Sequence, residues 1–190
     1  MKKIILINLL FLGSLYSQDY YFSNYAPFDD SIMSPEQFLG YPLGEMHTRH
    51  DLIVSYMEYL SENSEKAQIY HYGRTYEGRK LVILAVSTPD KILDIENIRD
   101  THLSYIHTDH PNYKNESKPD NFPVIINLAY NVHGNEPSSS EAALLTAYTL
   151  VSSESDEVNK YLNESGVLID PTINPDGRDR HTHWANTYKG

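Results

Sequence analysis

The clearest chemical signal in this sequence is a histidine and a glutamate three residues apart. His133 and Glu136 lie in the segment Tyr-Asn-Val-His-Gly-Asn-Glu-Pro at 130–137, where Gly134 permits a tight turn. An imidazole and a carboxylate at this spacing can converge on one cation, and catalytic zinc sites typically use three such protein ligands plus a water. The same pair can instead be a hydrogen-bonded loop histidine beside a carboxylate that favours a helix N-terminus. Spacing alone leaves both interpretations open.

The composition restricts the chemistry that is available. The 190 residues include no cysteine, which excludes disulfides, cysteine-based zinc fingers, iron–sulfur clusters and thiol catalysis, whereas nine histidines are present. The formal net charge of -11 argues against binding to nucleic acid or to anionic lipid. The hydrophobic fraction of 40% and the charged fraction of 22% are those of an ordinary globular protein. Any metal must therefore be held by His, Asp or Glu.

The flanking sequence predicts how the histidine and the glutamate are positioned. A near-continuous apolar run at 123–130 predicts a strand covered on both faces, and it ends just before His133. Ser138 and Glu141 then form a capping-box pattern that opens a helix. The pair thus follows the carboxyl end of a strand, where open α/β sheets bind their ligands.

The rest of the chain alternates between helical and strand patterns. We predict a helix within 44–61, an antiparallel pair of strands at 68–72 and 81–87, a helix at 91–106, a loop at 109–121, a short helix at 155–162, a buried strand at 167–170 and a turn at 174–177. Strand, helix and strand in the second half favour a parallel crossover. The fold class is therefore α/β, with a mixed, mainly parallel sheet and helices on both faces.

The N-terminus predicts secretion. Lys2 and Lys3 precede an apolar run at 4–12, and small residues follow up to Ser17, as in a secretory signal peptide. An N-terminal membrane anchor is the alternative, but the run is short for a permanent span. We expect a signal peptide at 1–17, secreted or periplasmic localisation and no permanent membrane span. An irregular leader at 18–43 and one domain at 44–190 follow.

Three motifs occur in a fixed order along the chain. The first is the stretch at 73–79, Gly-Arg-Thr-Tyr-Glu-Gly-Arg, which precedes a strand. The second is His-Gly-Asn-Glu at 133–136, and the third is Asn-Pro-Asp-Gly at 174–177. This arrangement resembles the zinc metallocarboxypeptidases, the carboxypeptidase A/B-like family. The resemblance implies Zn²⁺ as cofactor, His133 and Glu136 as the first two zinc ligands, and hydrolysis of C-terminal residues from peptide or protein substrates.

The resemblance also indicates what this sequence lacks. Members of the family carry a third ligand histidine, a general-base glutamate, a tyrosine and an Asn-Arg pair for the substrate carboxylate in a later half, and none of these can be matched here. A base is needed to take the proton of the zinc-bound water, and an Arg pair is needed to hold the terminal carboxylate. We therefore expect the N-terminal part of an incomplete carboxypeptidase-like domain, with the general base beyond Gly190 and no activity from these residues alone.

Other histidines and one asparagine are weaker candidates. His181 and His183 follow the third motif and could supply a ligand, but a role at the surface or cleft edge is expected. His47 and His50 are one helical turn apart, and we expect them to face solvent. Asn135 stands where some carboxypeptidases carry a basic residue that contacts substrate, so the substrate preference is left open.

Two other functions remain compatible with the sequence. One is a zinc-dependent amidase or deacylase of the same fold, which need not keep the Arg pair in the same place. The other is a non-catalytic binding module that retains two ligand-like residues. The residues that bind substrate and the oligomeric state are not predicted.

Overall fold

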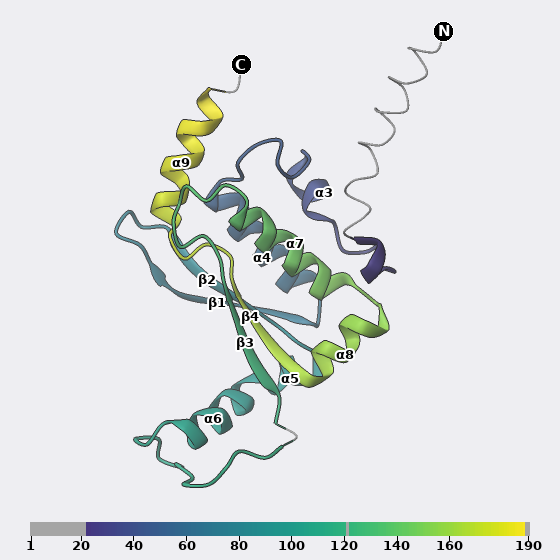
Figure 1. Cartoon of the computed structure of the whole chain (residues 1–190), viewed down its shortest axis with the longest axis vertical. Helices are drawn as coiled ribbons and strands as arrows, with labels where there is room; N and C mark the ends of the chain where they lie inside the picture. Colours follow the sequence, from purple (N-terminus) through teal and green to yellow (C-terminus); the bar gives the residue numbers. More distant parts are fainter. Residues whose placement is uncertain (1–21, 121, 189–190) are drawn as a thin grey trace.

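The computed structural model describes residues 22–120 and 122–188 (Figure 1). The signal peptide predicted at 1–17 lies outside the described residues. The described part contains, in chain order, η1 Ser23–Tyr25, α3 Pro35–Leu39, α4 His50–Asn63, β1 Ala67–Arg74, β2 Lys80–Val86, α5 Pro89–Leu93, α6 Ile95–Ile106, β3 Val124–Ala129, α7 Ser139–Ser152, α8 Asp156–Glu164, β4 Ser165–Asp170 and α9 Pro175–Thr187.

The strands form one mixed sheet in the order β1-β2-β4-β3. The β1–β2 hairpin is antiparallel, as predicted, and the β3–α7–α8–β4 crossover makes β3 and β4 parallel. However, β2 runs antiparallel to β4, so two of the three pairings in the described sheet are antiparallel. The expected mixed class is confirmed, whereas the expectation of a mainly parallel sheet is wrong here. The hairpin reverses the direction of the sheet at the β2–β4 junction.

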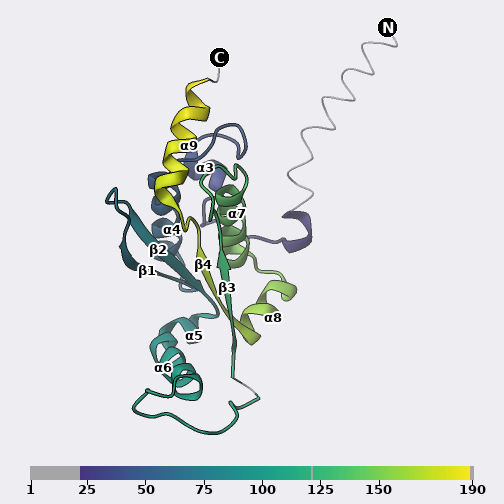
Figure 2. The same cartoon turned by 60° about the vertical axis from the view of Figure 1, so that its left-hand side comes forward.

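The main core lies between the sheet and helices α4 and α7 (Figure 2). Apolar residues at helical spacing give each helix one face directed at the sheet, and alternate strand residues meet them. The members supplied by the two helices and by β2 and β4 are Ile53, Tyr56, Met57, Leu60, Ala143, Leu144, Ala147, Val151, Leu84, Val86, Val167 and Ile169.

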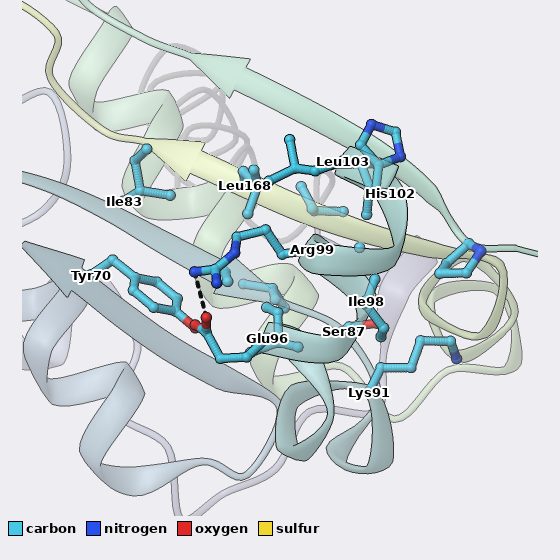
Figure 3. A pocket seen from close by; sticks show the side chains of 17 residues that line it. Tyr70, Ile83, Ser87, Lys91, Glu96, Ile98, Arg99, His102, Leu103 and Leu168 are labelled. Atoms are coloured by element: carbon cyan, nitrogen blue, oxygen red, sulfur yellow. Dashed lines mark hydrogen bonds and ion pairs between the residues drawn. The ribbon is translucent and has the colours of Figure 1, made fainter. Parts of the chain in front are cut away.

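Helices α5 and α6 lie against the opposite face of the sheet. The strand residues on that face, such as Ile83 and Leu168, alternate with the core residues of the same strands. A cavity of about 330 Å³ separates α6 from the sheet, and Figure 3 shows Leu103 of α6 facing these strand residues. Helices thus cover both faces, as predicted, but α6 packs less closely than α4 and α7.

Strand β3 differs from its prediction. It lies at the edge of the described sheet, and Val124 and Ile126 are 60% and 40% exposed. The strand was expected to be covered on both faces because its sequence is almost entirely apolar. An apolar run indicates that a strand is suited to burial but does not determine its position within a sheet.

Three local predictions are also corrected. The leader at 18–43 was expected to be irregular, but it contains α3, which begins with a complete capping box between Ser34 and Gln37. The helix expected at 44–61 begins only at His50. The helix expected at 91–106 is interrupted at Asp94, which ends α5 and precedes α6.

The segment before α4 packs on the rest of the domain. Phe28 pairs with Ser153 in an isolated antiparallel bridge, and Ile32 is 3% exposed within the core. In the part of the chain that is described, no helix has the length and apolar character needed to cross a membrane.

The position of β3 at the edge of the described sheet generates a prediction about association. An apolar edge strand with free backbone groups pairs readily with other chains. We expect the chain to associate as its concentration rises, and Ile126→Lys to reduce this association while changing the free energy of unfolding by no more than about 0.5 kcal/mol. Sedimentation velocity over a concentration series measures the effect. Leu93→Lys, at a 90% exposed position on α5, is the control and should associate like the wild type. A wild-type chain that is monomeric throughout would contradict the prediction.

Candidate metal centre at the end of strand β3

The two predicted ligands lie side by side. His133 and Glu136 belong to the loop at 131–137 between β3 and α7, which we call the ligand loop. His133 Nδ1 lies 2.7 Å from Glu136 Oε1, and the two side chains are 73% and 47% exposed. The hydrogen bond with His133 lowers the pKa of the Glu136 carboxyl. One imidazole nitrogen and one carboxylate oxygen therefore bond to each other at a position that solvent can reach.

The donor types fit zinc, but the described residues supply only this pair. Across 22–120 and 122–188, no group of three or more His, Cys, Asp or Glu side chains is arranged to hold a metal ion. His181 instead packs against His47, with ring centroids 5.1 Å apart, and burial lowers the pKa of the His181 imidazole. His183 is exposed on α9. The structure does not bring either of these histidines into a group with His133 and Glu136.

Gly134 allows the ligand loop to lie directly on the start of α9. A Cβ at Gly134 would be 1.9 Å from the carbonyl carbon of Gly177, so no side chain fits there. Gly134 was expected to permit a tight turn, and the Glu136 N–H does close a turn on His133 O at 3.0 Å. The residue of the ligand loop with positive φ, however, is Asn131, at 55°. The glycine is required because two backbones approach each other closely.

Helix α9 replaces the predicted turn at 174–177. Asn174 is its N-cap, and the Oδ1 atom accepts a hydrogen bond of 3.0 Å from the Gly177 N–H. Pro175 occupies the first turn, where a missing N–H costs nothing. The Asn174 Nδ2 atom also donates to Val132 O at 3.1 Å, so the cap holds the ligand loop. Asn followed by Pro is a known helix start, and this signal could have identified α9 from the sequence.

A buried ion pair joins α7 to α9. Arg178 is fully buried, and its Nη2 atom lies 2.5 Å from Glu141 Oε1. Arg178 also donates from Nε to Thr48 O at 3.0 Å and from Nη1 to Pro137 O at 3.2 Å. The same Glu141 oxygen accepts a hydrogen bond from the Thr48 N–H at 2.8 Å. One side chain thus ties the end of the ligand loop to two helices and to the segment before α4.

This ion pair corrects the predicted capping box. The Ser138 side chain makes no capping hydrogen bond to a described residue of α7, and the Ser138 backbone already has helical angles. Glu141 points inward to Arg178 rather than back to the helix start. The pair was missed because its members are 37 positions apart and no local pattern connects them.

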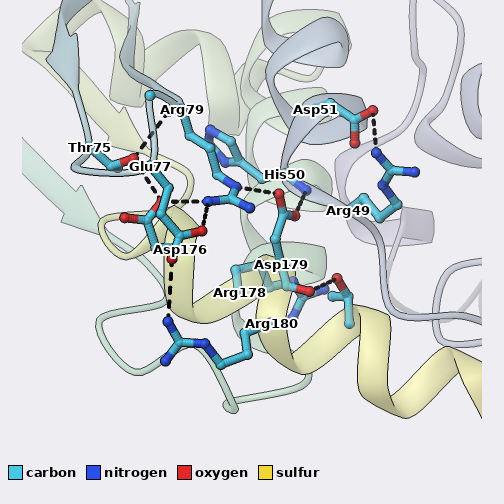
Figure 4. Close-up of polar contacts among 12 residues, drawn as sticks. Arg49, His50, Asp51, Thr75, Glu77, Arg79, Asp176, Arg178, Asp179 and Arg180 are labelled. Carbon is cyan, nitrogen blue, oxygen red and sulfur yellow. Dashed lines mark hydrogen bonds and ion pairs between the residues drawn. The ribbon is translucent and has the colours of Figure 1, made fainter.

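A second charged network joins α9 to the β1–β2 hairpin. Arg79 donates to Asp176 at 2.7 Å and to Asp179 at 2.5 Å, and it also pairs with Glu77 (Figure 4). Thr75 donates to Asp176 at 2.7 Å. The hairpin motif at 73–79 and the motif at 174–177 are therefore bound to each other directly.

His50 lies beside this network and is not solvent-facing as predicted. It is 3% exposed. Its backbone N–H donates to Asp179 Oδ1 at 2.9 Å, and its ring Nε2 lies 2.8 Å from Lys80 O. Burial lowers the pKa of the His50 imidazole. His47 precedes α4 and packs on His181, so the two histidines do not form a pair on one helix.

Comparisons with known proteins find a matching family model, a relative in sequence and solved structures with a similar fold. The zinc carboxypeptidase family model matches residues 53–189. Carboxypeptidase E of Caenorhabditis elegans is 28% identical over 137 residues, covering 70% of this chain and 24% of that protein. The solved structure of thrombin activatable fibrinolysis inhibitor is 18% identical with a TM-score of 0.50, covering 70% of this chain and 27% of that one. Carboxypeptidase A from Helicoverpa armigera is 18% identical with a TM-score of 0.49, covering 94% and 34%. The chain spans about a quarter of the length of the first two.

The buried ion pair generates a stability prediction. Arg178→Met leaves Glu141 buried without its cation, and we expect the free energy of unfolding to fall by about 3–5 kcal/mol. Urea denaturation measures the loss. Arg180→Met, at a side chain that is 77% exposed, is the matched control and should change little. The double variant with Glu141→Leu should recover part of the loss because both charges are then removed. An Arg178→Met protein as stable as the control would refute the structural role of the pair.

The close approach at Gly134 generates a second prediction. Gly134→Ala forces the ligand loop away from α9, and we expect it to lower the free energy of unfolding by about 1–3 kcal/mol, as overpacking does. Gly73→Ala is the control, since a Cβ there would meet only Leu81 Cδ1 at an ordinary 3.7 Å. Thermal unfolding of both variants provides the comparison. Equal losses in the two variants would argue against a specific backbone contact at Gly134.

Proposed function

Because the chain belongs to the zinc carboxypeptidase family, we propose that it forms part of a zinc-dependent hydrolase that removes C-terminal residues from peptides or proteins. The observation that carries the proposal is the position of His133 Nδ1, 2.7 Å from Glu136 Oε1 at an exposed strand end. The family match independently includes all of the ligand loop and α9 up to residue 187.

In this proposal His133 and Glu136 bind Zn²⁺. When bound, zinc lowers the pKa of a coordinated water and polarises the scissile carbonyl. The chain's own residues orient the ligands: Asn174 and Gly134 hold the ligand loop against α9, and Arg178 holds its last carbonyl. The exposure of both ligands leaves space for water and substrate. No residue of this chain is assigned as the third ligand, the general base or the group that binds the substrate carboxylate.

The remaining parts of the proposal follow from the sequence. The predicted signal peptide at 1–17 supports a secreted or periplasmic protein. We propose that the leader at 18–43 and the domain part at 44–190 belong to a longer protein, because the chain spans only about a quarter of the length of these relatives. Two ligands without a base or a carboxylate-binding group should give weak metal binding and no hydrolysis by these residues alone.

The amidase or deacylase alternative uses the same metal ligands. It would differ in the group that recognises the substrate carboxylate, to which no residue here is assigned. We prefer the peptidase, because the family match and the carboxypeptidase relative both point to it.

Zinc titration of the purified chain tests the ligand assignment. We expect binding of one Zn²⁺ that weakens more than about tenfold in His133→Ala and in Glu136→Gln, because each variant removes a direct ligand. Isothermal titration calorimetry measures the affinity. His183→Ala, at an exposed position of α9, is the control and should bind like the wild type. Unchanged binding by His133→Ala would exclude this histidine as a ligand.

A hydrolysis assay tests the second half of the proposal. Peptides with a free C-terminus and their amidated counterparts should both remain intact when the 190-residue chain is supplied with zinc. Rapid turnover of the free peptide by this chain would show that the described residues suffice, and would contradict the need for further catalytic groups.

A further inference from the structure

Asn131 is the residue at which the chain leaves β3 and enters the ligand loop. It is 1% exposed, and its φ of 55° lies in the left-handed region that asparagine adopts more readily than most residues. This backbone conformation ends the extended strand and turns the chain toward His133. A buried polar side chain at such a position needs hydrogen-bond partners.

The partners of the Asn131 NH₂ group are the backbones of the two predicted ligands. Its Nδ2 atom donates to His133 O at 3.1 Å and to Glu136 O at 3.3 Å. The Glu136 N–H also donates to His133 O at 3.0 Å, which closes the turn between the ligands. One NH₂ group therefore fixes the main chain on both sides of the site.

The backbone of Asn131 is itself held by both neighbouring helices. Its N–H donates to Ser139 Oγ at 2.7 Å, at the start of α7. Its carbonyl accepts from the Asn174 N–H at 3.2 Å, at the start of α9. Asn174 in turn donates to Val132 O. The amide is thus attached to the starts of two helices.

We propose that Asn131 is a positioning residue of the metal centre. Its buried amide holds the main chain at His133 and Glu136 so that the imidazole nitrogen and the carboxylate lie beside each other. The inference rests on the proposed function, in which these two side chains bind zinc. Asparagine meets both requirements: it tolerates φ of 55°, and its NH₂ group donates two hydrogen bonds to two carbonyls.

Two substitutions separate these requirements. Asn131→Gly keeps the left-handed backbone accessible but removes the donors. Asn131→Asp keeps the shape and directs carboxylate oxygens at two carbonyl oxygens, which cannot donate to it. The matched control is Asn135→Gly, because Asn135 is an exposed residue of the same loop.

The first experiment measures affinity of the whole chain for zinc by calorimetry, together with far-ultraviolet circular dichroism to confirm folding. We expect both Asn131 variants to bind Zn²⁺ about ten- to a hundredfold more weakly than the wild type, as removal of groups that orient ligands does. Asn135→Gly should bind like the wild type. A folded Asn131→Gly chain with wild-type zinc affinity would overturn the proposal.

The second experiment needs no metal. Amide hydrogen exchange of the Glu136 N–H, followed by NMR, reports whether the turn stays closed. We expect faster exchange in Asn131→Gly than in Asn135→Gly, while core amides of α4 exchange at the same rate in both. Unchanged exchange at Glu136 would also overturn the proposal. If the wild-type chain binds no zinc, the proposed metal function fails, and the exchange comparison still decides whether Asn131 orders the loop.

Discussion

The buried ion pair between Arg178 and Glu141 is the constraint on which the candidate site depends. Burying a guanidinium costs desolvation free energy unless an opposite charge pairs with it and its N–H groups are hydrogen-bonded. Here the compensation comes from Glu141, from the Thr48 carbonyl and from the Pro137 carbonyl. These groups belong to α7, to the segment before α4 and to the ligand loop. The bonds of Arg178 therefore bring the start of α9 together with all three. The position of the loop follows from that assembly.

The site combines exposed ligands with a buried support. His133 and Glu136 are open to solvent, whereas Asn131 and Gly134 beneath them are buried and leave little space for other side chains. Functional groups keep their geometry when their supporting shell is packed and hydrogen-bonded. The hairpin contributes to the same support, because Arg79 bonds to Asp176 and Asp179 on α9.

Much of the fold was predictable because it depends on local patterns. The helical spacing of Ile53, Tyr56, Met57 and Leu60 identified α4, and the two strand patterns on either side of the turn at 73–79 identified the antiparallel hairpin. The edge position of β3 was not predictable, because an apolar strand looks the same at the centre and at the edge of a sheet. Sheet direction was also mispredicted, since the β2–β4 pairing joins strands that are distant in the sequence.

For the site, the sequence by itself determined the residue types and their spacing: His133 and Glu136 after a strand, and an Asn-Pro-Asp-Gly segment after another. These features are local, because three residues and a turn suffice to bring an imidazole and a carboxylate together. Only the tertiary structure decided that Glu141 pairs with Arg178 rather than capping its helix, that Gly134 is needed for contact with Gly177, and that Asn131 bonds to both ligand backbones. The first two are contacts between segments far apart in the chain, and the third depends on a buried backbone conformation. Such contacts are selected by burial and packing, which no short pattern encodes.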